Sequence, residues 1–155
     1  MPGQIDQRLE ALGITLPSPT APVANYVPYT IADRTVFVAG QIPMINGHVH
    51  GVGRLGADLS IEEGQELARV CAMNLLAQAR AAAGGDLDQI ARVLKLGGFV
   101  CCTPDFTDHS AVINGASDLM VEVFGDIGRH ARFAVGAPSL PRGVAVEVEA
   151  IFLLR

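Results

Sequence analysis

Two long helical patterns, each enclosed by β-prone segments, constrain the fold of this chain more than any other sequence feature. Ser60 and Glu63 predict a capping box, because a Ser N-cap and a Glu three residues later each bind a backbone N–H of the other. The helix that begins there is expected to run to about Ala83, where a Gly-Gly pair ends it. Asp108 is the expected cap of a second helix, which Gly125 ends.

Five further segments are β-prone and lie before, between and after these helices. The expected strands span residues 26–31, 35–40, 93–102, 132–137 and 144–154. The first two predict a hairpin, and the third is an apolar run that predicts a central strand, which Gly97 and Gly98 could bulge. Because hairpin links and helical crossovers are mixed, we predict an α+β fold with one mixed sheet and two helices packed on one face. The other face would lack cover, which is typical of a subunit in a closed oligomer.

The N-terminal segment predicts a short helix followed by an extended arm. Ile5, Leu9 and Leu12 recur at helical spacing, and Gly13 is a natural stop. The next stretch, residues 15–28, contains four prolines and favours an extended segment lying on the body of the protein. We expect residues 1–155 to form a single domain, in which residues 1–21 are the helix and arm.

The composition restricts the classes of function. Apolar residues make up 50% of the chain and charged ones 17%, and the mean hydropathy of +0.35 is high for a small monomer. No apolar run is long enough to span a bilayer, so we assign the excess apolar surface to a subunit interface. The net charge is −5 and Lys95 is the only lysine, which argues against a protein that mainly binds nucleic-acid backbones. A small anion in a local pocket remains compatible with this charge.

The cysteines and the N-terminus indicate the compartment. The three cysteines do not make a disulfide framework, because their number is odd and adjacent Cys101 and Cys102 would point to opposite faces of a strand. We therefore expect buried, reduced thiols. The N-terminus lacks the basic and apolar regions of a secretory signal, so the sequence predicts a cytoplasmic protein.

Three other patterns carry weak functional signals. Residues 51–56 match G-x-G-x-x-G, but four residues separate them from the next helix, so a flexible loop near a site, with Arg54 reaching a ligand, is favoured over a dinucleotide site. His48 and His50 share a strand face, but no obvious further ligands complete a metal site, so we expect exposed histidines. Lys95 could form a Schiff base, although a lysine extending to solvent from the edge of a strand is the favoured interpretation.

The C-terminal segments hold the most informative charged residues. Residues 132–137 and 144–154 predict a hairpin, in which Glu147 and Glu149 share one face of the last strand with apolar residues. This hairpin would place the strand of Arg132 beside Glu147. The guanidinium could hold that carboxylate, or it could bind a ligand carboxylate through two parallel hydrogen bonds. An ordinary ion pair at a subunit interface is an equal alternative.

From Pro22 to the C-terminus, the chain resembles the reactive intermediate deaminases, the RidA or YjgF family, whose members are often called L-PSP endoribonucleases. The residues that carry the resemblance are Tyr26-Val27, Gly40-Gln41-Ile42-Pro43, Asn114, Arg132-x-x-Val135, Leu140-Pro141 and Glu147-Val148-Glu149-Ala150. The N-terminal extension, the loop at 51–56 and the His130-Ala131 pair are typical of a longer branch of the family.

The resemblance implies a chorismate-mutase-like subunit and a homotrimer with its sites in the clefts between subunits. It implies hydrolytic deamination of reactive 2-imino acids, or their enamine tautomers, to 2-keto acids and ammonia, without a metal or organic cofactor. Arg132 matches the family's substrate-carboxylate arginine, and Glu147 matches the carboxylate that positions water. Tyr26, Gly40 and Asn114 match pocket-lining positions.

The chain departs from the family pattern at three positions. Ala39 stands where a small hydroxyl residue is common, Phe133 where serine is frequent, and Ala134 where cysteine is frequent. We expect Ala134 to contact substrate through its backbone. Two alternatives stay open: a non-catalytic protein of the same fold that binds small carboxylates or regulates a partner, and, less favoured by the charge, an endoribonuclease or translation inhibitor.

Overall fold

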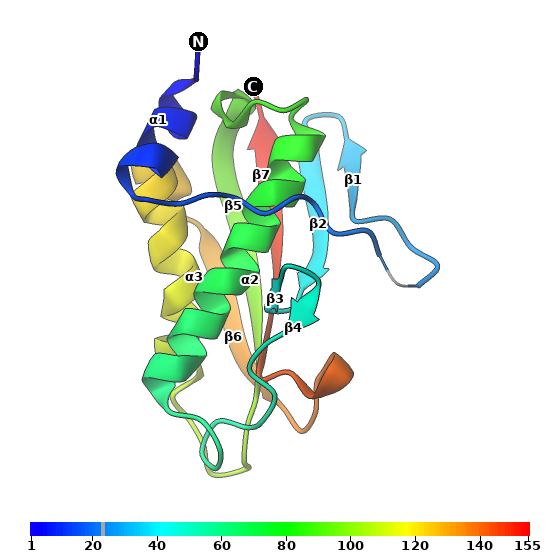
Figure 1. Ribbon diagram of the computed structural model, residues 1–155, viewed down its shortest axis with the longest axis vertical. Helices are drawn as coiled ribbons and strands as arrows, with labels where there is room; N and C mark the ends of the chain where they lie inside the picture. Colours follow the sequence, from blue (N-terminus) through cyan, green and yellow to red (C-terminus); the bar gives the residue numbers. More distant parts are fainter. Residues whose placement is uncertain (23) are drawn as a thin grey trace.

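A five-stranded mixed sheet carries the fold, and its strands follow the order β1-β2-β7-β5-β6 (Figure 1). The computed structural model describes residues 1–22 and 24–155. The strands are β1 (Tyr29–Ala32), β2 (Thr35–Gln41), β5 (Ile90–Cys101), β6 (Ala131–Ala137) and β7 (Val146–Leu154). β5 and β6 run parallel, whereas the other neighbouring pairs are antiparallel. The predicted α+β fold with one mixed sheet is confirmed.

Helices α2 (Ile61–Ala82) and α3 (His109–Phe124) pack on one face of the sheet (Figure 1). α2 begins at the predicted capping box: the Ser60 hydroxyl accepts the Glu63 N–H at 3.1 Å, and the Glu63 carboxylate accepts the Ser60 N–H at 2.7 Å. Asp108 precedes α3 as predicted, but its side chain makes no capping hydrogen bond. Among the helices described, none is long and apolar enough to cross a lipid bilayer.

The two helices approach each other closely at a glycine. A side chain at Gly115 in α3 would overlap the carbonyl oxygen of Gln65 in α2. The Gln65 side-chain amide also donates to the Ala111 carbonyl oxygen at 2.9 Å, which ties the two helices together. The core lies between these helices and the sheet. Its fully enclosed side chains include Leu75, Leu96, Leu119, Met120, Val146 and Phe152.

The N-terminal helix and arm lie over this helical layer. α1 (Gln4–Ala11) contacts α3, and the chain then crosses α2 (Figure 1). There the buried side-chain amide of Gln78 donates to the Thr20 carbonyl oxygen at 2.9 Å. This hydrogen bond ties the arm to α2, and Val23 lies outside the described residues.

A small separate hairpin follows β2. Its strands are β3 (Met44–Ile45) and β4 (His48–Val49), and its turn residues, Asn46 and Gly47, have φ values of 51° and 79°. This left-handed pair is typical of a two-residue hairpin turn. The buried amide of Asn74 in α2 donates to two carbonyl oxygens at the entrance of the hairpin, both at 3.1 Å.

The opposite face of the sheet has no helix over it in the part of the chain that is described (Figure 1). Phe37 of β2 pairs with Ile151 of β7 on this face, whereas their neighbours Val36 and Phe152 are 0% exposed beneath the helices. Phe37 keeps 44% of its surface exposed. An open apolar sheet face of this kind is typical of a surface that another subunit covers.

Two predictions about the sheet are wrong. β6 and β7 do not form a hairpin, because β5 lies between them and pairs with both. β5 is also not bulged at Gly97 and Gly98, since its register with β7 shifts within residues 90–95 instead. The two glycines have a packing role: Gly97 leaves room for the Phe133 ring, and Gly98 leaves room for Ile113 of α3. The buried, reduced state expected of the cysteines is confirmed for all three.

Candidate functional site

Arg132 lies on β6, at the edge of the sheet, with its side chain turned toward α3. Its Nη1 donates to the Asn114 side-chain oxygen at 2.8 Å and to the Ser117 hydroxyl at 3.1 Å. Both acceptors are neutral, and Arg132 forms no ion pair with a carboxylate of the described residues. Two contacts account for the two N–H groups of Nη1. Nε and Nη2 then remain as a parallel pair of donors, which is the geometry that binds a carboxylate through two hydrogen bonds.

His130 lies next to Ser117. His130 Nε2 lies 2.9 Å from the Ser117 hydroxyl, and His130 Nδ1 lies 2.7 Å from the Gly128 carbonyl oxygen. Because a carbonyl oxygen can only accept, Nδ1 carries the proton and Nε2 accepts from the Ser117 hydroxyl. Burial lowers the pKa of His130 despite the hydrogen bond to Gly128, and the positive charge of Arg132 adds to the lowering.

Glu147 lies on β7, on the face of the sheet that the helices leave open. Its half-buried carboxyl group lies against Gly40 of β2, where a Cβ atom would come within 2.5 Å of Oε1. The missing side chain at Gly40 thus makes room for this carboxyl group. Burial raises the pKa of Glu147, and the negative charge of Glu149 raises it further. A carboxyl group tuned in this direction is suited to pass protons in both directions.

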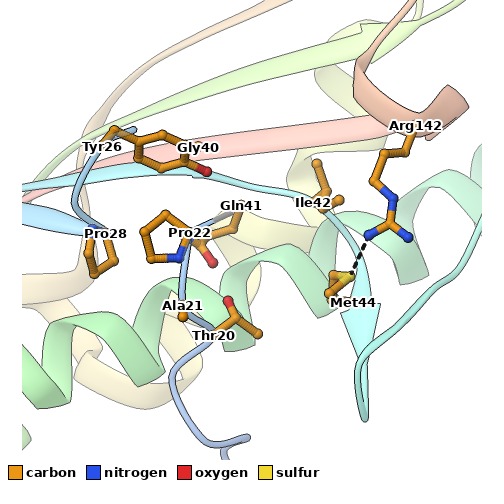
Figure 2. A pocket seen from close by; sticks show the side chains of 10 residues that line it. All are labelled: Thr20, Ala21, Pro22, Tyr26, Pro28, Gly40, Gln41, Ile42, Met44 and Arg142. Carbon is orange, nitrogen blue, oxygen red and sulfur yellow. Dashed lines mark hydrogen bonds between the residues drawn. The ribbon is translucent and has the colours of Figure 1, made fainter. Parts of the chain in front are cut away.

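Gly40 also lines a small open hollow between β2 and the N-terminal arm. Figure 2 shows Tyr26 and Arg142 at opposite ends of this hollow. The Arg142 guanidinium is exposed and lies 3.6 Å from the Met44 sulfur. Tyr26 and Gly40, which the resemblance assigns to a ligand pocket, therefore do line one hollow. Arg142 adds a cation at its far end.

Arg132 and Glu147 do not meet within one chain, so the expectation that the strand of Arg132 lies beside Glu147 is wrong, and the guanidinium does not hold that carboxylate within the chain. Arg132 is in register with Leu96, which is 0% exposed beneath the helices, whereas Glu147 is in register with Phe99, three residues further along β5. Residues paired across neighbouring strands share a sheet face, and faces alternate along a strand. The guanidinium and the carboxyl group therefore lie on opposite faces of the sheet.

The site residues fall into two groups, which we name after their charged members. The arginine group comprises Arg132, Asn114, Ser117, His130 and Ala134. The half-buried Ala134 lies two residues after Arg132 on the edge strand β6, so its side chain shares the face of Arg132.

The glutamate group comprises Glu147, Gly40 and Tyr26. Glu147 and Gly40 are in contact on neighbouring strands, and Tyr26 lies beside Gly40 at the hollow.

Phe133 and Lys95 lie on the open face and outside both groups. The Phe133 ring packs edge-on against Phe99 with 5.3 Å between centroids, and Lys95 Nζ lies 5.4 Å from the Phe133 ring centre. Lys95 lies on β5, which is an inner strand, and its side chain is exposed to solvent, as the favoured interpretation expects. Its contact with Phe133 is a cation–π interaction.

The glycine-rich loop at residues 51–56 borders the turn that carries Arg142. The Gly53 N–H donates to the Gly143 carbonyl oxygen at 3.1 Å, and Leu55 is fully buried, so the loop is anchored rather than free. A ligand contact by Arg54 stays a prediction. The two histidines that precede the loop are exposed, as expected.

Three residues beside the predicted site were missed from sequence. Ser117 and His130 are 13 residues apart, and no short motif joins them. The His130-Ala131 pair was visible only as a departure from the family pattern. In the sequence, Arg142 is an ordinary turn residue. Its distinguishing feature is a left-handed backbone conformation with φ 58°, which the sequence does not reveal.

Comparison with known proteins finds relatives along nearly the whole chain. A family model described as "YjgF/chorismate mutase-like, putative endoribonuclease" matches residues 6–152. Protein TCP17 of Trypanosoma cruzi is 48% identical over 150 residues, which cover 96% of this chain and 93% of that protein. The crystal structure of Atu1372, a protein of unknown function from Agrobacterium tumefaciens, is 47% identical with a TM-score of 0.90, covering 97% of this chain and 94% of that one. The YjgF gene product of E. coli is 26% identical with a TM-score of 0.63, covering 89% and 94%.

Proposed function

This chain belongs to the YjgF/chorismate mutase-like family, and from that premise we propose that it hydrolyses reactive 2-imino acids, or their enamine tautomers, to 2-keto acids and ammonia. The substrate is a small molecule that carries one carboxylate and one electrophilic C=N carbon. The observation that carries the proposal is the free Nε and Nη2 edge of Arg132, held by two neutral acceptors. A fixed guanidinium without a carboxylate of its own is suited to a carboxylate ligand.

Glu147 supplies the second half of the reaction. Water adds its oxygen to the imine carbon while the C=N electron pair moves onto nitrogen, and Glu147 accepts a proton from that water and returns it to the nitrogen. The C–N bond then breaks with its electrons on nitrogen and releases ammonia, and the remaining hydroxyl gives its proton to Glu147, which passes it to the ammonia as the carbonyl forms. Overall, a protonated imine and one water give a 2-keto acid and an ammonium ion. The raised pKa of Glu147 supports this role, since the carboxyl group must both take and give a proton.

The two groups of the site come together between two copies of the chain. Within one chain they lie on opposite sheet faces, so one copy cannot place its Arg132 and its Glu147 on the same small substrate. The open apolar face and the edge strand β6 are surfaces that a second copy can cover. A homotrimer with sites between subunits, as the family resemblance implies, satisfies this requirement through closed symmetry.

RNA cleavage is the second candidate, because the matching family model is described by that activity. The net charge of −5 and the single lysine disfavour it, since backbone phosphates are held mainly by clustered cations. Tight binding of single-stranded RNA that weakens steeply with salt would revive this candidate.

An imine-hydrolysis assay tests the proposed function. A 2-imino acid is generated from its amino acid by an oxidase, and its decay is compared with and without the protein. We expect wild type to accelerate the decay, Arg132→Ala to lose the acceleration, and Arg129→Ala to keep it, because Arg129 is an exposed arginine with only a loose contact to Asp126 at 3.5 Å. Wild type that binds pyruvate but does not accelerate decay would instead be a non-catalytic carboxylate-binding protein.

A further inference from the structure

Arg132 is held by a chain of hydrogen bonds that begins at a backbone carbonyl. The Gly128 carbonyl accepts from His130 Nδ1, His130 Nε2 accepts from the Ser117 hydroxyl, and the Ser117 oxygen accepts from Arg132 Nη1. With a neutral imidazole, every donor and acceptor in this sequence has one consistent assignment, because the Gly128 carbonyl cannot donate and the Arg132 guanidinium cannot accept. We name Gly128, His130, Ser117 and Arg132 the relay.

His130 determines the direction in which the Ser117 hydroxyl donates its hydrogen bond. A serine inside a helix commonly turns its hydroxyl proton toward the carbonyl oxygen one turn earlier, which redirects its lone pairs. In α3, the Ser117 hydroxyl donates to His130 Nε2 instead, at 2.9 Å. The lone pairs of Ser117 are then free to receive the Arg132 guanidinium at 3.1 Å.

A neutral imidazole is essential to this arrangement. A protonated ring would donate from both nitrogens and could no longer accept from Ser117. Burial and the positive charge of Arg132 both lower the pKa of His130, so the neutral form is favoured next to the guanidinium.

We propose that His130, acting through Ser117, is a positioning residue that aims the free edge of Arg132 at the substrate carboxylate. This inference rests on the proposed function, because it assigns a role within the same site. The relay fixes a long side chain that would otherwise sample several rotamers, so the ordering cost is met before the ligand binds. Neither His130 nor Ser117 needs to touch the substrate.

Substitution of Ser117 or His130 should weaken carboxylate binding but leave the catalytic step in place. Ser117→Ala and His130→Leu should each raise the dissociation constant for pyruvate and the KM for imino acid by roughly threefold to tenfold, which is within the range for one lost hydrogen bond. The kcat value should change little, because Glu147 is untouched. Ser117→Thr, which keeps the hydroxyl, and His130→Gln, whose amide oxygen can accept in place of Nε2, should restore most of the affinity.

Ser110→Ala is the matched control, since Ser110 lies exposed in the first turn of the same helix. It should leave pyruvate affinity unchanged. A purely structural role predicts instead that affinity follows melting temperature in all variants and that the conservative variants give no rescue. That result would overturn the relay.

Nitrogen NMR of the imidazole gives a second readout that does not depend on activity. The relay requires the proton of His130 to reside on Nδ1 at neutral pH, with Nε2 as the acceptor. A proton found on Nε2 would overturn the proposal. Wild type that binds pyruvate normally while Ser117→Ala binds it equally well would overturn the relay alone. Wild type that neither binds pyruvate nor hydrolyses imino acids would overturn the proposed function as well.

Discussion

The carboxyl group of Glu147 is half-buried, and the charged group that acts on it is another acid, Glu149. Glu147→Gln keeps the shape of the side chain but cannot transfer a proton. We predict a loss of turnover of about 10²-fold or more, with pyruvate affinity retained, because the carboxylate is bound by Arg132. Steady-state kinetics and a pyruvate titration on the same sample check this. Loss of folding or of assembly in Glu147→Gln would assign the residue a structural role instead.

Glu149→Gln is the matched control for this change. Removing the like charge should lower the pKa of Glu147, because Glu149 contributes to raising it. Turnover should then persist, with the acidic limb of its pH–rate profile displaced to lower pH. An unchanged profile would show that the two carboxyl groups are not coupled.

The substitution Glu147→Gln should also change how the stability of the protein depends on pH. A carboxyl group whose folded pKa is raised above its ordinary value of 4.5 contributes stability that is complete below that value. This contribution is lost as the pH rises through the raised folded pKa. Because glutamine does not ionise, the melting temperature of Glu147→Gln relative to wild type should increase as the pH rises from below 4.5 through the raised pKa of Glu147. A pH-independent difference would contradict the raised pKa.

Arg132 offers a test of geometry against charge. Lysine keeps the positive charge but lacks the paired donors, so Arg132→Lys should weaken pyruvate binding roughly tenfold to a hundredfold, and Arg132→Ala should weaken it further. The melting temperature should stay nearly constant, because the partners within the fold are two neutral acceptors on the α3 surface. Calorimetric titration and thermal unfolding of each variant check this pair. Unaltered affinity would remove Arg132 from the site, and a fall of many degrees would make it structural.

At the scale of elements, the contact between α2 and α3 overrides helix propensity. Gly115→Ala would gain about 1 kcal/mol from propensity alone in an isolated helix. In the protein, the new methyl group would overlap the Gln65 carbonyl oxygen, and a rigid backbone atom cannot move aside without separating the helices. We predict net destabilisation, since overpacking typically costs about 1–3 kcal/mol. Thermal unfolding should show a lower melting temperature for Gly115→Ala, whereas Asp118→Ala, at an exposed position of α3, should be neutral or mildly stabilising.

How far the sequence could predict these elements depends on how local each signal is. The Ser60–Glu63 capping box lies within four residues, so it could be read directly and is present in the structure. The strand that pairs with β6 is β5, which lies between β6 and β7 in the sheet. The residues that connect β6 to β7 do not show whether the two strands pair directly as a hairpin or leave room for a third strand between them. The alternation of apolar and polar residues predicts which side chains share a face within one strand. It does not predict whether Arg132 and Glu147 lie on the same face of the sheet, because that depends on the register of β5 with both neighbouring strands.

At the scale of the whole molecule, the open sheet face indicates that the chain assembles with further copies of itself. Phe37 and Val135 each keep 44% of their surface exposed there, which is costly for a monomer with a mean hydropathy of +0.35. We predict that light scattering at micromolar concentration gives about three times the chain mass of 16.3 kDa. A stable monomer would contradict both the trimer and any site shared between copies.

Subunit mixing tests the shared site itself. In Arg132→Ala every copy keeps Glu147, and in Glu147→Gln every copy keeps Arg132, so each variant alone should be inactive by the arguments above. If one copy supplies the arginine group and its neighbour the glutamate group, co-expression of the two variants creates some interfaces with both wild-type groups. In a closed symmetric ring assembled at random from equal amounts, about one quarter of the interfaces should be complete.

Turnover should therefore recover to about a quarter of wild type in the co-expressed sample. It should stay absent when the separately purified variants are mixed without exchange. A co-expressed sample without activity, despite proven mixed assembly, would place both groups on the same copy, which the opposite sheet faces of Arg132 and Glu147 do not allow for one small substrate.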